Sequence, residues 1–124
     1  MTKIIHIKSN NIELEGILND TDTAQAIWDI LPVETEVKMW GDEIYFRIPL
    51  DLPLEQGQEI VELGDLGYWP IGSAFCIFFG PTPMSHGDEI RPASAVTVFG
   101  KVVGDAAVLK GISADSMISV TQKT

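Results

Sequence analysis

The stretch LGYWPIGSAFCIFFGPTPMS, residues 66–85, runs for twenty residues without a charged side chain. A membrane-spanning helix needs about twenty consecutive apolar residues. Prolines and glycines would interrupt such a helix here at Pro70, Gly72, Gly80, Pro81 and Pro83. The longest apolar block is only AFCIFF, which has the length of a strand. We therefore predict a buried central strand at SAFCIFF, residues 73–79, and no membrane span.

Further short strands are predicted on both sides of this stretch. Asn10 and Asn11 suit a tight hairpin turn between residues 3–9 and 12–18. Gly41 and Asp42 indicate a second hairpin, between residues 34–40 and 43–50. Other strands are expected within residues 60–72, which Gly64 and Asp65 divide or bend, and at residues 95–103 and 115–122.

Two helices complete the predicted elements. In residues 19–32, Asp20 or Thr21 suits the N-cap and Pro32 ends the helix. Four apolar residues fall on one face of this helix: Ala24, Ile27, Trp28 and Leu31. A shorter helix is expected between an Asp105 cap and Gly111. About eight short strands with two helices favour a closed barrel or a sandwich over alternating β–α–β units.

Composition limits the classes of partner. The chain has 18 acidic and 8 basic residues and a formal net charge of -10, so nucleic acid and anionic membrane surfaces are not expected partners. The single cysteine, Cys76, allows no internal disulfide and suits a reducing compartment, so we expect a cytoplasmic protein. The N-terminal residues do not form a signal peptide, so export is not indicated.

Metal and cofactor chemistry have little support in the sequence. His86 lies near Asp88 and Glu89, but one histidine with two adjacent loop acids defines no coordination geometry. His6 falls on a predicted strand and is expected at the surface, and neither histidine has a nucleophile at a catalytic spacing. We expect no metal and no cofactor.

Three segments resemble motifs of the cyclophilins in the same order along the chain. GDLGYW (64–69) is similar to a strand of the form G-x-L-S-M-A, SAFCI (73–77) to SQFFI, and VFGKVVGDAAVLKGI (98–112) to VFGKV and its following helix. Together with WGDEIYF (40–46), they make the whole chain resemble the small prokaryotic cyclophilin-like domain family, an uncharacterised group. The resemblance implies an all-β fold: one cyclophilin-like closed barrel of about eight strands over residues 1–124, capped by two short helices.

The resemblance does not carry over the cyclophilin isomerase site. Arg47 is the candidate counterpart of the arginine that polarises the substrate amide, but no G-F-M-x-Q-G-G segment follows it. Cys76 and Val96 align with a pocket phenylalanine and a pocket histidine of the cyclophilins. Trp69 and Pro70 stand where the cyclophilins have alanine and asparagine. We therefore do not expect efficient peptidyl-prolyl isomerase activity, since function resides in the site rather than in the barrel.

The candidate ligand-binding residues come from the uncharged stretch, the preceding strand and the proline-rich loop of residues 80–94. Arginines offer several N–H donors, aromatic rings offer a platform for a ligand, and long loops in compact domains are often functional. The alternatives are a solvated Arg47 on the outer barrel face, core packing of the two aromatic rings, and an ion pair of Arg91 with a carboxylate such as Asp88. The predicted ligand-binding set is Arg47, Tyr68, Trp69, Met84, His86 and Arg91.

Three functions remain open from the sequence. The leading hypothesis is a binding module for a small molecule or peptide, in a cleft at the barrel face. The first alternative is a peptidyl-prolyl isomerase with a reworked site. The second is a non-catalytic interaction subunit of a larger assembly, because resembling barrels also occur within amide-hydrolysing carboxylase and oxoprolinase enzymes. A protein partner would be required in that case.

Overall fold

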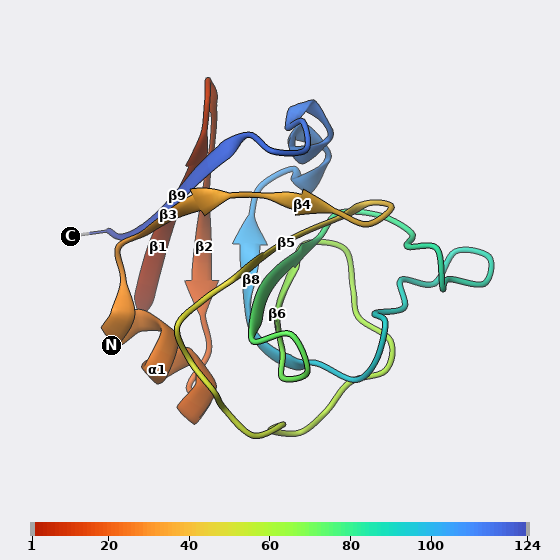
Figure 1. Ribbon diagram of the computed structural model, residues 1–124, viewed down its shortest axis with the longest axis horizontal. Helices are drawn as coiled ribbons and strands as arrows, with labels where there is room; N and C mark the ends of the chain where they lie inside the picture. Colours follow the sequence, from red (N-terminus) through yellow and green to blue (C-terminus); the bar gives the residue numbers. More distant parts are fainter. Residues whose placement is uncertain (1, 124) are drawn as a thin grey trace.

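The computed structural model describes residues 2–123. These residues form nine strands, one α-helix and one 3-10 helix (Figure 1). In chain order the elements are β1 (Lys3–Ser9), β2 (Ile12–Leu18), α1 (Asp22–Ile30), β3 (Val33–Glu36), β4 (Lys38–Met39), β5 (Glu43–Arg47), β6 (Asp65–Trp69), β7 (Ala74–Phe78), β8 (Thr97–Val103), η1 (Ala106–Gly111) and β9 (Met117–Gln122).

The strands form one antiparallel sheet that nearly closes into a barrel. The strand order is β3-β9-β1-β2-β8-β6-β7-β5-β4. β3 and β4 stand at opposite ends of this order, yet only Val37 separates them along the chain. The backbone N–H of Val37 donates to the Ser116 carbonyl at 2.9 Å, and the Asp115 N–H donates to the Val37 carbonyl at 2.9 Å. The predicted all-β, cyclophilin-like barrel is confirmed, with nine strands in place of about eight.

The first predicted hairpin is confirmed and the second is only half correct. β1 and β2 pair around Asn10, whose φ of 55° is the left-handed conformation that such turns use. β4 pairs with β5 around Gly41 and Asp42, but β3 pairs with β9 instead of continuing the hairpin. The predicted strand at residues 34–40 changes partners at Val37, because the barrel closes at that point.

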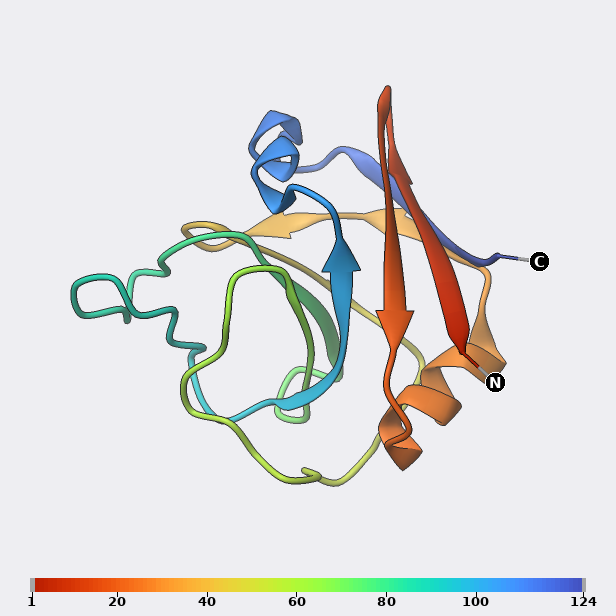
Figure 2. The ribbon, with the colours of Figure 1, turned by 180° about the vertical axis from the view of Figure 1, so that it is seen from behind.

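The two helices cover opposite ends of the barrel (Figures 1 and 2). The Thr21 hydroxyl caps α1 by accepting from the Ala24 N–H at 3.0 Å, and α1 buries Ala24 and Ile27. Asp105 caps η1, which is a 3-10 helix and buries Ala106 and Leu109. Both helices were predicted at these positions. No helix formed by residues 2–123 is long and apolar enough to cross a membrane.

β7 is buried on both of its faces, as predicted for SAFCIFF. The rings of Phe46, Phe75 and Phe99 pack together inside the barrel, with centroid distances of 4.8 Å and 5.0 Å. On the outer face of the sheet a second, smaller hydrophobic cluster lies under the connecting loops, and its buried members are Val61, Ala74, Cys76, Phe78, Ile90 and Val96. The predicted loop at residues 80–94 forms no strand or helix, apart from a bridge between Val61 and Ile90. This loop and the outer face of β5, β7 and β6 frame the hollows described below.

Candidate functional site

Three polar side chains project from the outer face of β5. Successive residues of a strand point to opposite faces. Ile44 and Phe46 are buried in the barrel core, so Glu43, Tyr45 and Arg47 point outward. We call these three residues the outer row. Their backbones are spaced about 7 Å apart along the strand.

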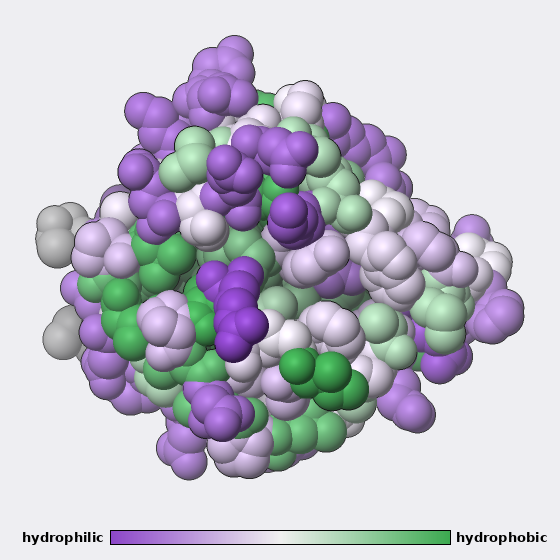
Figure 3. Space-filling model, viewed as in Figure 1, coloured by the Kyte–Doolittle hydropathy of each residue, from purple (hydrophilic) through white to green (hydrophobic). Residues whose placement is uncertain are grey.

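A cleft opens beside Arg47 because a small residue separates two large ones. Ala74 of β7 is the register partner of both Arg47 on β5 and Trp69 on β6. Two strand spacings place the Arg47 and Trp69 backbones about 10 Å apart, with only a methyl group between them. The resulting main cleft has a volume of about 650 Å³ and is lined by Glu34, Thr35, Glu36, Lys38, Tyr45, Phe46, Arg47, Trp69, Gly72, Ala74 and Met117. Hydrophilic residues stand directly beside hydrophobic ones on the face seen in Figure 3.

Trp69 forms one wall of the main cleft without filling it. Its indole N–H donates to the Ser94 hydroxyl at 2.6 Å, which joins β6 to the end of the proline-rich loop. Gly72 packs against the other side of the ring, where an added Cβ would lie 2.7 Å from two ring carbons. The ring is therefore held in place, and its N–H donor is already used within the protein.

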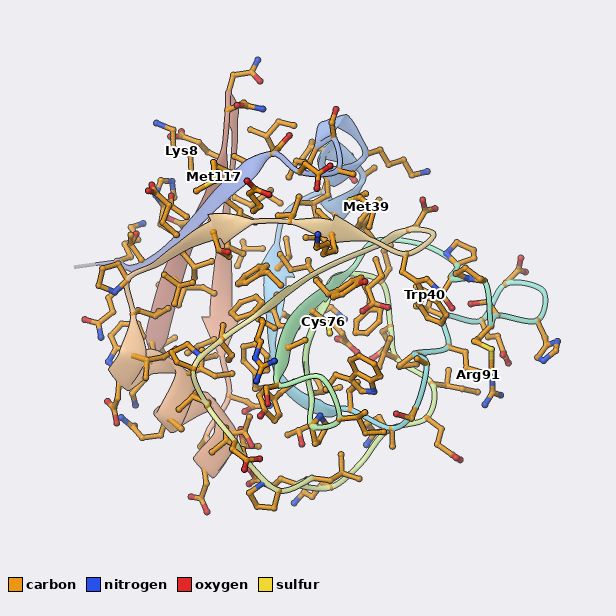
Figure 4. The ribbon with its side chains drawn as sticks, viewed as in Figure 1. Lys8, Met39, Trp40, Cys76, Arg91 and Met117 are labelled. Atoms are coloured by element: carbon orange, nitrogen blue, oxygen red, sulfur yellow. The ribbon has the colours of Figure 1, made fainter. Side chains whose placement is uncertain are left out.

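A smaller hollow, the side pocket, adjoins the main cleft. Trp40 and Glu43 face each other across the Gly41–Asp42 turn and exchange backbone hydrogen bonds of 3.0 Å and 3.2 Å. Figure 4 shows Trp40 near the end of the β4–β5 hairpin, on the side of the loop that carries Arg91. The side pocket has a volume of about 190 Å³ and is lined by Trp40, Glu43, Tyr45, Trp69, Pro92, Ala93 and Val96. It shares Tyr45 and Trp69 with the main cleft.

Glu43 brings a buried carboxyl group to the side pocket. The residue is 6% exposed. Burial raises the pKa of Glu43 from its ordinary 4.5 to about 7, because loss of water disfavours the charged form. A hydrogen bond from the Cys76 thiol partly opposes this rise in pKa. Burial, together with the neighbouring Glu43, raises the pKa of Cys76 well above its ordinary value, so this thiol is not an activated nucleophile.

A third hollow lies along the proline-rich loop. This loop groove has a volume of about 290 Å³ and shares Pro92 and Ala93 with the side pocket. Its lining residues are Glu59, Met84, Arg91, Pro92, Ala93, Ser94 and Ala95. The Arg91 Nε lies 2.7 Å from a carboxylate oxygen of Glu89, so the ion pair expected for Arg91 forms with Glu89 rather than Asp88. The three hollows follow one another through shared residues.

The six predicted ligand-binding residues divide among several places. Arg47 and Trp69 lie together in the main cleft, and Met84 and Arg91 lie together in the loop groove. His86 is exposed and lines none of these hollows.

Tyr68 lies in the barrel core instead. It is fully buried, and its hydroxyl donates to the Leu50 carbonyl at 2.9 Å and accepts from the Leu52 N–H at 3.1 Å. The structure thus brings only Arg47 and Trp69 to the main cleft.

Several lining residues were missed in the sequence, above all Trp40, Glu43 and Tyr45. The signal for them was present. A two-residue turn at Gly41–Asp42 pairs Trp40 with Glu43, and the alternation along EIYFR puts Glu43 and Tyr45 on the same face as Arg47. Among residues 2–123, no group of three or more histidine, cysteine or acidic side chains is placed to hold a metal ion.

Comparisons with known proteins agree with this architecture. The family model described as cyclophilin-like matches residues 3–121. The chain belongs to the cyclophilin-like family. A similar solved structure is the solution structure of the hypothetical protein AF2241 from Archaeoglobus fulgidus, with a TM-score of 0.83 and 38% sequence identity over 98% of this chain and 95% of that one. No curated protein matches the sequence.

The resemblance to the isomerases aligned two residues near the side pocket, Cys76 and Val96, with residues of the isomerase proline pocket. Val96, aligned with a pocket histidine, lines the side pocket. Cys76, aligned with a pocket phenylalanine, does not line the pocket but contacts the Glu43 carboxyl. Both residues therefore differ chemically from the isomerase side chains that the resemblance implies at these positions.

Proposed function

We propose that this cyclophilin-like protein binds a small molecule or a short extended peptide on the outer face of β5. The observation that carries the proposal is the main cleft between Arg47 and Trp69. Its volume of about 650 Å³ falls within the roughly 300–1,000 Å³ typical of ligand sites. Its lining combines the apolar side chains of Trp69 and Met117 with charged side chains that include Arg47, so a ligand finds both apolar and polar contacts.

Arg47 supplies the strongest polar contact for a ligand in the main cleft. Its side chain is exposed, and none of the ion pairs formed by residues 2–123 involves it. A guanidinium group offers several N–H donors and keeps its charge at all physiological pH values. It therefore suits a carboxylate or a carbonyl group of the ligand, while the Trp69 ring contacts the apolar part of the ligand.

The arrangement of the three adjoining hollows suits the binding of a peptide as well as of a compact ligand. The main cleft, the side pocket and the loop groove are joined by shared residues, Tyr45 with Trp69 and then Pro92 with Ala93. An extended chain advances about 3.3 Å per residue, so alternate side chains of a bound peptide match the spacing of the outer row. Side chains of alternate residues would then enter neighbouring hollows.

A thermal-shift screen tests the proposal. Metabolites and short peptides are tested for stabilisation of the wild type, then of Trp69→Ala and Arg47→Gln. The control is Lys110→Gln, which removes an exposed charge from η1, away from the hollows. We expect hits that stabilise the wild type and the control but not the two cleft variants. A screen without any hit, or with hits that all four proteins share, would count against the proposal.

Prolyl isomerisation is the second candidate, favoured by Arg47 and the Trp69 ring in the same cleft. Such catalysis needs a donor that polarises the amide and an apolar pocket for the twisted proline. The donor is present in Arg47. The side pocket, however, would bury the Glu43 carboxyl against a proline ring without a hydrogen-bond partner from the ring, which is unfavourable. Binding without isomerisation is therefore the better-supported function.

A further inference from the structure

The side pocket combines a buried acid with three aromatic rings. We propose that it recognises an ammonium group, carried by a small amine or by a lysine side chain, with Glu43 as the counter-ion and Trp40, Tyr45 and Trp69 as the walls. The inference rests on the proposed function, since it names the chemical group that a ligand in the main cleft inserts into the adjoining side pocket. It is tested below with probes too short to reach Arg47.

The Glu43 carboxyl lacks a cationic partner in the part of the chain that the structure describes. None of the ion pairs formed by residues 2–123 involves Glu43, and the side pocket contains no basic residue. The side-chain partner of its carboxyl is the uncharged thiol of Cys76. An ionised carboxylate in so buried a position is unfavourable until a cation pairs with it. A ligand ammonium group supplies both the opposite charge and hydrogen-bond donors.

Three aromatic side chains surround the position that the ammonium group would take. Trp40 faces Glu43 across the hairpin turn, Tyr45 follows two residues along the same face, and Trp69 closes the opposite side. The faces of aromatic rings attract cations within about 6 Å, and tryptophan does so most strongly. Groups of aromatic side chains recognise alkylated ammonium groups for this reason. A carboxylate among the rings adds a direct ion pair.

Anionic groups, apolar groups and complete drug-sized ligands fit the side pocket poorly. An anionic group would meet the Glu43 carboxylate at close range, and a purely apolar group would leave that carboxyl with no side-chain partner besides the Cys76 thiol. The volume of about 190 Å³ is below the range that holds a complete drug-sized ligand, so the pocket takes one group of a ligand. A short alkylammonium group matches both the size and the charge.

The ionisation of Glu43 gives the site a pH dependence. The other titratable groups at the pocket are the Cys76 thiol from β7 and the Tyr45 phenol from β5, and the loop contributes only Pro92, Ala93 and Val96. The pKa of the Cys76 thiol is raised well above its ordinary value by burial and by Glu43, so the thiol stays uncharged between pH 6 and pH 8. With the pKa of Glu43 at about 7, the ionised fraction rises about tenfold over this range. Ammonium binding is therefore expected to be about tenfold stronger at pH 8 than at pH 6.

The experiment uses three probes of equal length: n-butylammonium, n-butanol and butyrate. Binding is followed by the NMR shifts of the indole N–H groups of Trp40 and Trp69 at pH 8. We expect n-butylammonium to bind with a Kd on the order of 1 mM, n-butanol at least tenfold more weakly, and butyrate not at all. Equal binding of n-butanol and n-butylammonium, or no shift with n-butylammonium, would overturn the proposal.

Two variants test whether the Glu43 carboxylate is the group that recognises the ammonium ion. Glu43→Gln keeps the size of the side chain and is expected to remove the preference for n-butylammonium over n-butanol. Glu13→Gln is the matched control, because Glu13 is an exposed acid on β2 that lines none of the three hollows. Binding of n-butylammonium to Glu43→Gln at the wild-type affinity would contradict the inference. If Glu43→Gln does not fold, the comparison of the three probes on the wild type still decides the question.

One further pair of probes distinguishes the two possible sources of the ammonium group, a lysine side chain and a free amine. N-acetyl-lysine methylamide presents a lysine side chain, and its Nζ-acetylated form lacks the charge. Selective binding of the charged form supports a lysine-bearing peptide, and binding of n-butylammonium alone supports a free amine. If the library screen finds no ligand whose binding depends on Arg47 while n-butylammonium binds, the proposed function is contradicted. The side pocket then remains as a cation site.

Discussion

Arg47 and Trp69 stand on either side of Ala74 in one register row of the barrel sheet, on β5, β7 and β6. The row explains why a cleft exists at this point. Two large side chains rise from the outer strands, and the central strand contributes only a methyl group. The same row explains why Arg47 remains exposed to solvent, since Ala74 offers it no partner.

Filling this gap is expected to abolish binding in the main cleft. Ala74→Leu adds three carbon atoms between Arg47 and Trp69, at the floor of the cleft. We expect at least a tenfold loss of affinity for ligands found in the library screen, measured by titration calorimetry. Ala107→Leu, the same change at an exposed position of η1, serves as the control. Unchanged affinity in a folded Ala74→Leu protein would mean that the ligand binds elsewhere.

Tyr68 is expected to act through stability rather than binding. Tyr68→Phe removes the hydroxyl that bonds both Leu50 and Leu52 and thereby fixes the loop after β5. Leaving these backbone groups without their partner is expected to lower the free energy of unfolding by about 1–3 kcal/mol. Urea denaturation measures this loss. Wild-type stability combined with weaker ligand binding would instead place Tyr68 in the site, as predicted from the sequence.

Glu43 is expected to make the protein less stable as the pH rises. Its folded pKa of about 7 lies above the ordinary 4.5, so between these values the folded state holds a proton that the unfolded state has released. The stabilisation by the protonated form is complete below about pH 4.5 and is lost as the pH rises through 7. The shift corresponds to about 3 kcal/mol in the free energy of unfolding.

Glu43→Gln isolates this contribution, because glutamine does not titrate. Asp65 also has a pKa raised by burial, and it acts in the same direction from its ordinary value of 3.8, so the wild type alone does not identify the group responsible. We expect denaturation midpoints to fall between pH 5 and pH 8 more steeply in the wild type than in Glu43→Gln. Equal slopes for the two proteins would show that Glu43 does not titrate in this range.

A chymotrypsin-coupled assay with a proline peptide tests the isomerase alternative. We expect the wild type and Arg47→Ala both to give the uncatalysed rate, because Cys76 and Val96 stand where the resemblance implies a pocket phenylalanine and a pocket histidine. Catalysis by the wild type that disappears in Arg47→Ala would favour the isomerase instead. Catalysis retained in both proteins would assign the activity to residues other than Arg47.

The sequence predicted the barrel well because its signals are local. Alternation, turn residues and helix caps identified the first hairpin, the buried strand at SAFCIFF and both helices. The break at Val37 was missed because it depends on barrel closure, a long-range feature in which β3 pairs with β9 across more than eighty residues of chain. No local pattern in residues 34–40 distinguishes a strand with one partner from a strand that changes partners.

The site was predicted less well because it depends on register. Tyr68 and Trp69 were both assigned to the cleft, although neighbouring residues of a strand point to opposite faces and only Trp69 faces outward. Glu43 was overlooked although it shares the outer row with Arg47. The loop residues Met84, His86 and Arg91 had no pattern that fixes their position, since prolines and glycines in a loop constrain the backbone but not its place on the barrel.

The most direct test of ligand binding at the outer row is an NMR titration of labelled protein with the strongest hit from the library screen, repeated on Arg47→Gln. The account predicts that the shifts in the wild type concentrate on Tyr45, Arg47, Trp69 and Ala74, and that Arg47→Gln reduces affinity at least tenfold. Shifts that concentrate on residues outside the three hollows, with equal affinity in the variant, would contradict it.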